Sequence, residues 1–276
     1  MTIIDGKKIS KEILSKVEAE IKSLPFQPVF TDVLVGDDKV SKQYVDMKAR
    51  AAKSVGILFH NANFPASITT EELVKEIKAL NKIPNMCGII LQLPLPAHVD
   101  TRSALDAVDP EIDVDCLGTI AGEKFYKGHI ELGFPTALAC MKVIDSLNLD
   151  LSNKNIVVLG QGNLVGKPVT SMLGFRRLSP FVIRSTTENK EELIKNADII
   201  ISGIGKGKHI TGEMIKKGAI VIDAGTSESG AGIVGDVDLD SVKDVAGYVS
   251  PVPGGVGPVT VAMLLNNVLT VAKNKS

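Results

Sequence analysis

The sequence predicts an α/β fold divided into two domains. Short runs rich in Val and Ile alternate with segments of helical period, a pattern typical of a largely parallel sheet covered by helices. The alternation is tighter in the second half of the chain than in the first, which favours two separate units. At 276 residues the chain is long enough for each unit to bury a core of its own.

The first half is predicted to alternate helices with strands. Helices are expected where apolar residues recur at three- and four-residue spacing, at 10–24, 41–55 and 70–81. Strands are expected at the Val-, Ile- and Leu-rich runs between them, at 29–35, 57–61 and 88–91.

The second half repeats the alternation with shorter strands. These strands are expected at 156–159, 181–184, 198–202, 219–222 and 247–249. A helix at 136–147, beginning after Pro135, would join the two halves, and a last helix at 260–272 would return to the first domain. The first domain is therefore expected to comprise residues 1–132 with 260–276, and the second residues 133–259, with a substrate cleft between them.

The charge balance indicates a small partner. Lys and Arg number 31 against 32 Asp and Glu, so the formal net charge at pH 7 is -1. Such a chain has no global attraction for nucleic acid or for an anionic membrane. We therefore expect a small-molecule partner, with no nucleic acid and no membrane.

The cysteines and histidines form no recognisable framework. Cys87, Cys116 and Cys140 are odd in number and far apart, which predicts free thiols in a reducing compartment. The histidines lack the spacing of a zinc motif, so no metal site is expected. The N-terminal stretch is charged, and no run of about 18 apolar residues occurs, so we expect a cytoplasmic protein.

A glycine-rich turn, NIVVLGQGNLVGKP, follows the first strand of the second half. Gly160 would permit a tight turn, Gly162 would let the backbone approach a pyrophosphate, and the helix beginning near Gly166 would offer free N–H groups. This context predicts a Rossmann-type NAD(P)-binding domain. The G-x-G-x-x-x-G spacing departs from the usual fingerprint, so the alternative is a strand-to-helix turn that merely needs glycine.

The next strand ends in FVIRSTTE, where an NAD site usually places a carboxylate on the ribose 2'-hydroxyl. Arg184 stands there instead and could pair with a 2'-phosphate, with the Ser185 hydroxyl as a further donor. NADP is therefore the favoured cofactor, and NAD is the weaker alternative. A solvated arginine is the other interpretation of Arg184.

Tyr44 and Lys48 are four residues apart in the helix expected at 41–55, so they share a face. The ring could stack on a flat heterocycle, and the amine could relay protons beside it. A helical lysine is more often solvated, and a helical tyrosine is usually partly buried core. Position alone leaves both interpretations open.

Two further segments carry polar groups suited to a ligand. In GIILQLPLP, Gln92 lies at the carboxyl end of a buried strand, where its amide could bond an amine and a substrate carbonyl or could be a capped core group. In DPEIDVDCL most carboxylates are expected to be solvated, but one held in a cleft could accept two N–H bonds from an aminopyrimidine-like ring. Charge alone does not choose among Asp109, Glu111, Asp113 and Asp115.

The run SPVPGGVGPVT, residues 250–260, is the most unusual stretch of the chain. Its prolines stiffen the backbone, its glycines allow close approach to a ligand, and Thr260 is expected to begin a helix. An interdomain linker, the alternative, would be more polar and less tightly patterned.

Taken together, YVDMK, LQLPLP, DVD, GxGNxVGKP and PVPGGVGPVT closely resemble the bifunctional methylenetetrahydrofolate dehydrogenase/methenyltetrahydrofolate cyclohydrolase family. The resemblance covers nearly the whole chain. It implies an enzyme that oxidises 5,10-methylenetetrahydrofolate with NADP and hydrolyses the product to 10-formyltetrahydrofolate. It also implies a homodimer formed through the nucleotide domains. A monofunctional dehydrogenase and a non-catalytic NAD(P)-binding sensor are the alternatives.

The resemblance also assigns roles to residues. It makes Lys48 the catalytic lysine and Tyr44 the residue that stacks on the pterin. Gln92 matches the glutamine that contacts the lysine, and Asp115 matches the aspartate that holds the pterin ring. Further substrate contacts fall on Leu91, Leu93, Pro253, Gly254, Gly255, Val256 and Gly257. Cofactor contacts fall on Gly160, Gln161, Gly162, Ser185 and Thr226, and Arg184 and Thr260 are expected to contact the cofactor as well.

Several positions depart from the family pattern. Cys116 replaces the usual glycine, so a different course is expected for the loop after Asp115. GFPTA, residues 133–137, replaces the usual P-C-T-P. Thr226 stands where isoleucine is usual, and Gly162 stands where serine is common, which bears on the balance between NADP and NAD.

Overall fold

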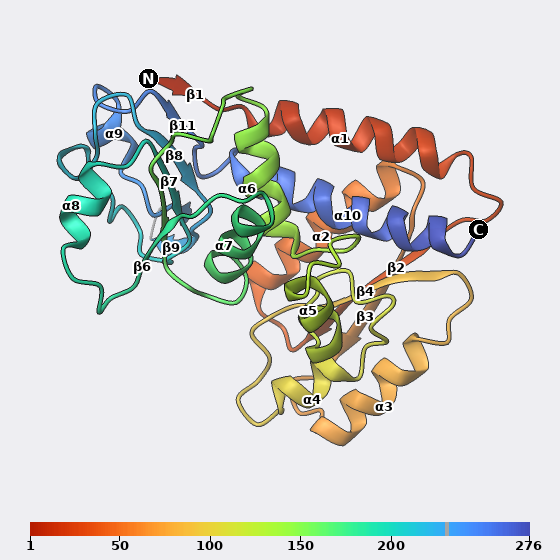
Figure 1. Cartoon of the computed structure of the whole chain (residues 1–276). Coiled ribbons are helices and arrows are strands. Elements are labelled where there is room, and N and C mark those ends of the chain that lie inside the picture. The colour runs from red at the N-terminus through yellow and green to blue at the C-terminus, as the bar shows by residue number, and fades with distance from the viewer. Residues whose placement is uncertain (230–231) are drawn as a thin grey trace. The chain divides into compact units, whose positions relative to one another are not determined.

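The computed structural model describes residues 1–229 and 232–276, which form two compact units (Figure 1). The three-stranded unit comprises Glu12–Pro135 and Val261–Ser276. The six-stranded unit comprises Met1–Lys11 and Thr136–Thr260. Each unit has a parallel sheet and helices, which confirms the two-domain α/β class expected from the alternating pattern.

The three-stranded unit is built on a sheet of order β3-β2-β4. The strands are β2 (Val29–Val35), β3 (Leu58–Phe64) and β4 (Met86–Leu91), and both pairings are parallel. Parallel neighbours need crossover connections, which α2 (Lys39–Ser54) and α3 (Thr70–Leu80) provide. Every residue of the central strand β2 is buried, as expected for a strand covered on both faces.

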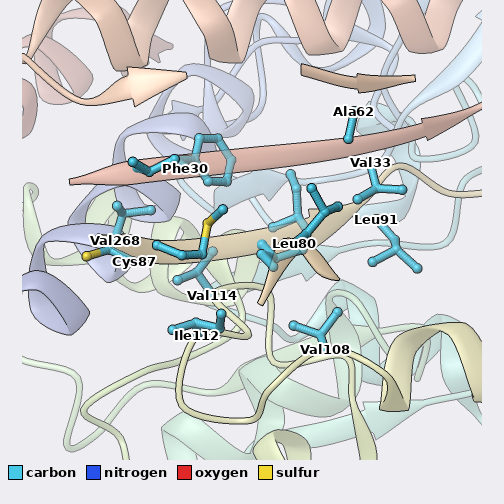
Figure 2. Close-up of a cluster of buried hydrophobic side chains, with 14 of the residues drawn as sticks. Phe30, Val33, Ala62, Leu80, Cys87, Leu91, Val108, Ile112, Val114 and Val268 are labelled. Atoms are coloured by element: carbon cyan, nitrogen blue, oxygen red, sulfur yellow. The ribbon is translucent and has the colours of Figure 1, made fainter. Parts of the chain in front are cut away.

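The core of the three-stranded unit lies around β2 and β4. Figure 2 shows part of it, with Phe30 and Val33 from β2, Leu91 from β4, and Val268 from the last helix, α10 (Val256–Asn274). A Cβ added to Gly88 would lie only 2.8 Å from Val268 Cγ2, so glycine lets α10 approach the strand closely.

Three further helices belong to this unit: α1 (Gly6–Ile21, which begins in the other unit) and the shorter α4 (Thr101–Asp106) and α5 (Thr119–Tyr126). Side-chain caps fix several helix starts. Asp38 accepts a hydrogen bond of 2.7 Å from the Ser41 backbone N–H at the start of α2. Thr69 and Glu72 form a reciprocal capping box at the start of α3.

The six-stranded unit has the sheet order β1-β11-β8-β7-β5-β6. All five pairings in this sheet are parallel. The strands are β1 (Thr2–Ile3), β5 (Ile156–Leu159), β6 (Phe181–Ile183), β7 (Ile199–Ser202), β8 (Ile220–Asp223) and β11 (Tyr248–Val249). Its other elements are α6 (Pro135–Asp145), α7 (Gly166–Phe175), α8 (Lys190–Lys195), a 3-10 turn (Gly212–Met214), α9 (Leu239–Val242), and the antiparallel pair β9 (Ser227–Ser229) and β10 (Gly232–Val234).

The N-terminal segment belongs to the six-stranded unit. The backbone N–H of Ile4 donates to Val249 O at 2.9 Å, and the Ile4 side chain is buried. The division expected from the sequence put these residues with the first domain instead. Two residues of strand carry no period that could predict the pairing of β1 with β11.

By length and composition, one helix within residues 1–229 and 232–276 could cross a membrane, and that helix is α10. Most of its apolar stretch is buried inside the protein. Leu265 and Val268 belong to the core of the three-stranded unit, and Asn267 donates to the carbonyls of Val114 and Gly133 at 2.8 and 2.7 Å. These contacts are those of a core helix, and they fix the loop that follows Val114.

Candidate active site

Helix α2 presents the lysine singled out by the sequence. Lys48 follows Tyr44 by about one helical turn, and its side chain is only 12% exposed. Its Nζ donates a hydrogen bond of 2.9 Å to Gln92 Oε1. A mostly buried ammonium is thus oriented by an amide from a different element.

Gln92 is positioned by the sheet. It comes directly after β4, and its backbone N–H donates to Val33 O at 2.9 Å, so it extends the ladder with β2 by one residue. Its Nε2 donates to Leu93 O at 3.3 Å, which fixes the amide with its oxygen toward Lys48. Leu91 is buried and Leu93 is half-buried, while the Leu93–Pro94 peptide is cis.

A carboxylate not anticipated from the sequence also contacts the lysine. Asp32, in the middle of β2, has a fully buried side chain, and its Oδ2 lies 2.7 Å from Lys48 Nζ. Burial raises the pKa of Asp32, and the nearby charge of Lys48 opposes that rise. The signal was present in VFTDVLV, where one carboxylate interrupts an apolar run, but its partner lies on the following helix.

Asp115 belongs to a loop organised by another aspartate. Asp113 is buried, accepts a hydrogen bond of 2.7 Å from the Gly118 N–H, and pairs with Ile89 of β4 through an isolated bridge. Asp115 is half-buried, and desolvation raises its pKa to about 7. The Lys48 charge lowers that pKa, while Asp113 and Asp32 raise it further. Lys48, Gln92, Asp32 and Asp115 thus form one electrostatic group, which we call the lysine cluster.

Cys116 stands where the family usually has glycine, and its backbone has a conformation typical of glycine. Cys116 is buried and has φ +57°, in the left-handed region that favours glycine. Burial, together with the charges of Asp113 and Asp115, raises the pKa of its thiol. Of the four carboxylates considered in this segment, Asp109 and Glu111 are exposed as expected, whereas Asp113 is not.

The glycine-rich turn lies at the carboxyl end of β5. Gly160 has φ +87°, and a Cβ added to Gly166 would lie 2.0 Å from Gly160 O, so both positions need glycine. Gln161 Nε2 donates to Gly160 O at 2.8 Å and to Thr170 Oγ1 at 3.1 Å, which ties the turn to α7. Space is open around Gly162.

Three further predicted cofactor residues, Arg184, Ser185 and Thr226, lie at the same edge of the sheet. Arg184 and Ser185 follow β6 and are exposed, and Thr226 follows β8 and is also exposed. The start of α7 has no side-chain cap at Val165, so its first N–H groups are not satisfied by the preceding side chain. A glycine turn, an uncapped helix start and an arginine at the strand ends suit a dinucleotide phosphate.

The proline-glycine turn forms a compact structure before α10. The Val252–Pro253 peptide is cis, Gly254 has φ +106°, and the Gly255 N–H donates to Pro251 O at 2.7 Å. The expectation that Thr260 begins the last helix is wrong, because α10 begins at Val256. Thr260 lies one turn inside, where its Oγ1 donates to Val256 O. Val256 and Gly257 therefore belong to the first helical turn.

The six-stranded unit has a parallel sheet with a glycine turn at its carboxyl edge, as nucleotide-binding domains do. The three-stranded unit holds a buried lysine that contacts an amide and a carboxylate. Together these features define a two-domain, nucleotide-dependent α/β enzyme. The sequence matches the model of the tetrahydrofolate dehydrogenase/cyclohydrolase catalytic domain over residues 4–115. It matches that family's NAD(P)-binding domain over residues 135–276. The chain therefore belongs to the tetrahydrofolate dehydrogenase/cyclohydrolase family, as the five motifs implied.

Individual relatives agree along their whole length. The bifunctional protein FolD of Nitratiruptor sp. is 41% identical, covering 100% of this chain and 99% of the relative. The FolD dehydrogenase/cyclohydrolase structure from Campylobacter jejuni has 34% identity and a TM-score of 0.93, with 100% of both chains covered. The Trypanosoma brucei FolD structure, a complex with NADP cofactor and inhibitor, has 34% identity and a TM-score of 0.93, covering 100% of this chain and 98% of that one.

Proposed function

We propose that this enzyme oxidises 5,10-methylenetetrahydrofolate with NADP and hydrolyses the methenyl product to 10-formyltetrahydrofolate. Membership of the dehydrogenase/cyclohydrolase family supports both reactions. The observation that best supports the hydrolytic reaction is the 2.9 Å hydrogen bond from Lys48 Nζ to Gln92 Oε1. A monofunctional dehydrogenase or a nucleotide sensor would have no evident need for this buried pair.

Lys48 is assigned the proton transfers of hydrolysis. Water must attack the cationic methenyl carbon, and a ring nitrogen must gain a proton as the ring opens. Lys48 offers an ammonium held in a fixed direction by Gln92. General acid-base catalysis requires such a group within hydrogen-bond reach of the reacting atoms.

Asp115 and Tyr44 are assigned to the pterin. The Asp115 carboxylate can accept two parallel N–H bonds from an aminopyrimidine edge, and its pKa of about 7 leaves much of it ionised near neutrality. Tyr44, one helical turn from Lys48, can stack on the ring. Leu91, Leu93 and the turn of Pro253–Gly257 are assigned further substrate contacts.

The glycine turn and the strand ends of the six-stranded unit are assigned to NADP, which when bound accepts the hydride. Gly160, Gln161 and Gly162 would approach the pyrophosphate. Arg184 and Ser185 would contact the 2'-phosphate, because both are exposed directly after β6. Thr226 and Thr260 are assigned lesser contacts. A homodimer formed through the nucleotide domains and a cytoplasmic location complete the proposal.

The experiment supplies 5,10-methylenetetrahydrofolate with NADP or NAD and follows reduced nicotinamide, methenyl product and 10-formyl product separately. Formation of reduced NADP together with the 10-formyl product is expected. Accumulation of methenyl product would indicate a monofunctional dehydrogenase. Failure of folded protein to turn over either cofactor would favour a sensor.

Lys48→Met tests the role of the lysine. It should lower the rate of methenyl hydrolysis by at least about 100-fold, because the proton-transfer group is lost. Lys53→Met, at an exposed lysine in the last turn of α2, is the matched control and should hydrolyse like the wild type. Full hydrolysis by Lys48→Met would eliminate the assignment.

A further inference from the structure

Asp32 is an anomalous residue for the core of a parallel sheet. Its side chain is 0% exposed in the central strand β2, with register partners Asn61 of β3 and Ile90 of β4. Neither Oδ1 nor Oδ2 has an aligned hydrogen-bond partner within the described residues. Buried carboxylates normally accept several hydrogen bonds, and one without them disfavours folding.

The single charge partner of Asp32 within the described ranges is Lys48, 2.7 Å from Oδ2. An ion pair this deeply buried recovers little net stability, because both charges lose their water. For folding alone, apolar residues in place of both charges would suit the two positions as well or better. The carboxylate therefore calls for a reason other than stability.

The geometry gives that reason. Asp32 lies on β2, and Gln92 extends β4, the neighbour of β2, so two adjacent elements of one sheet present an acceptor to the same ammonium. An ammonium has three N–H donors, and these two contacts constrain its direction. Oδ1 and Oδ2 of Asp32 are both inaccessible, so Asp32 can act on a bound folate only through Lys48.

We infer that Asp32 is a positioning residue that holds the Lys48 ammonium, together with Gln92, in the direction used for cyclohydrolysis. The inference rests on the proposed role of Lys48. It deepens that role by naming the carboxylate behind the amine. Asp32 touches no substrate, and its contribution should appear in the hydrolytic turnover rather than in folate affinity.

The pH dependence of hydrolysis provides a specific readout. Besides Asp32, the carboxylates that interact in the lysine cluster are Asp115, which belongs to it, and Asp113, from the loop after Ile112. Tyr44 is the titratable neighbour on α2, and β3 contributes His60, which is exposed and in register with Thr31. Removing the negative charge of Asp32 makes nearby groups release protons more readily. The pH profile should therefore move to lower pH.

The test uses Asp32→Asn, which keeps the shape, and Asp32→Val, which removes every polar atom. In both, the ratio of the cyclohydrolase kcat to the dehydrogenase kcat should fall by about tenfold or more, the range seen when an outer partner of an active group is lost. The KM for the methenyl substrate should change much less than kcat. The hydrolytic pH profile should shift by about one unit to lower pH.

The activity ratio, measured beside stability, separates a positioning role from a structural one. Asp32→Val alone leaves the mostly buried Lys48 ammonium without its carboxylate, so it should unfold at a lower temperature than the wild type, whereas Asp32→Val combined with Lys48→Met replaces both charges and should recover that loss. If Asp32 serves only to hold the fold, folded Asp32→Val would keep the wild-type activity ratio despite its lower unfolding temperature. Asp37→Asn, at an exposed carboxylate just before α2, is the matched control and should match the wild type in all four measurements.

The outcomes distinguish this inference from the function it rests on. If Lys48→Met loses hydrolysis but both Asp32 variants keep the wild-type activity ratio and pH profile, the role of Asp32 is overturned and that of Lys48 stands. If Lys48→Met hydrolyses normally, both assignments fail. A lower ratio with the shifted profile in folded Asp32→Val supports the inference.

Discussion

At the residue scale, the polar groups of the lysine cluster differ in how far the sequence reveals them. Gln92 was a candidate from the sequence, because it ends an apolar strand, and the family resemblance chose between a site residue and a capped core group. Asp32 could not be assigned in the same way. A strand with a single carboxylate remains a strand by its pattern, and its contact with Lys48 depends on how α2 packs against β2. Sequence patterns specify elements better than they specify which side chains meet across them.

Asp115 should make the free energy of unfolding fall as the pH rises, the opposite of what a carboxylate with a lowered pKa does. Its pKa rises from 3.8 to about 7 on folding, so the folded protein binds this proton more tightly than the unfolded chain. The stabilising contribution is fully present below about pH 4 and is lost as the pH rises through about 7. Asp115→Asn stays neutral, so its melting temperature should rise relative to wild type between about pH 5 and about pH 8.

The measurement for Asp115 is the difference in melting temperature between variant and wild type across that pH range. Asp109→Asn, at an exposed aspartate of the same segment, should show a much flatter difference. A difference for Asp115→Asn that stays constant with pH would contradict the raised pKa.

At the scale of elements, the apolar strands and the long periodic helices were predictable, and the short helices were not. The strand expected at 29–35 is β2 itself, because a buried run of seven residues has a clear signature. Helices α4, α8 and α9 have at most six residues each, too few to display a period. The start of α10 was misplaced because Thr260 looks like a cap, whereas Pro258 suits the first turn of a helix that already begins at Val256.

The contact between β4 and α10 leads to a prediction about packing. Gly88→Ala would place a Cβ 2.8 Å from Val268 Cγ2 and 3.0 Å from Val114 Cγ2. Such overpacking should cost about 1–3 kcal/mol of unfolding free energy in a urea titration. Adding Val268→Ala makes room, so the double variant should lose less stability than the sum of the two single variants.

Gly174→Ala in α7 is the matched control for that substitution. No atom lies within 4 Å of its added Cβ, so it should be neutral or stabilise by about 0.5–1 kcal/mol. Strict additivity of Gly88→Ala and Val268→Ala would show that the two side chains do not compete for space.

At the scale of the whole molecule, the chain passes between its units more than once. Residues 1–11 contribute β1 to the six-stranded unit, α1 enters the three-stranded unit, and the chain returns to that unit at Val261. The alternating pattern was enough to predict two units and a largely parallel sheet. It could not assign the first residues, because membership depends on a pairing made about 245 residues away along the chain.

Deleting residues 2–4 should loosen the six-stranded unit in particular. The deletion removes β1 and the buried Ile4, and leaves β11 as an unprotected edge. Amide hydrogen exchange in β11 and its neighbour β8 should quicken, with a smaller change in β2 and β4 of the other unit. Equal effects in both units would contradict an assignment of β1 to one of them.

The three cysteines have a practical consequence. All are buried, and burial raises the pKa of each thiol, so the folded enzyme presents no reactive sulfur to a maleimide. A cysteine introduced on the surface can therefore carry a fluorophore without prior removal of the native ones. Cys87 and Cys140 belong to different units, so alkylation of each in a denaturant series would report the opening of its own unit.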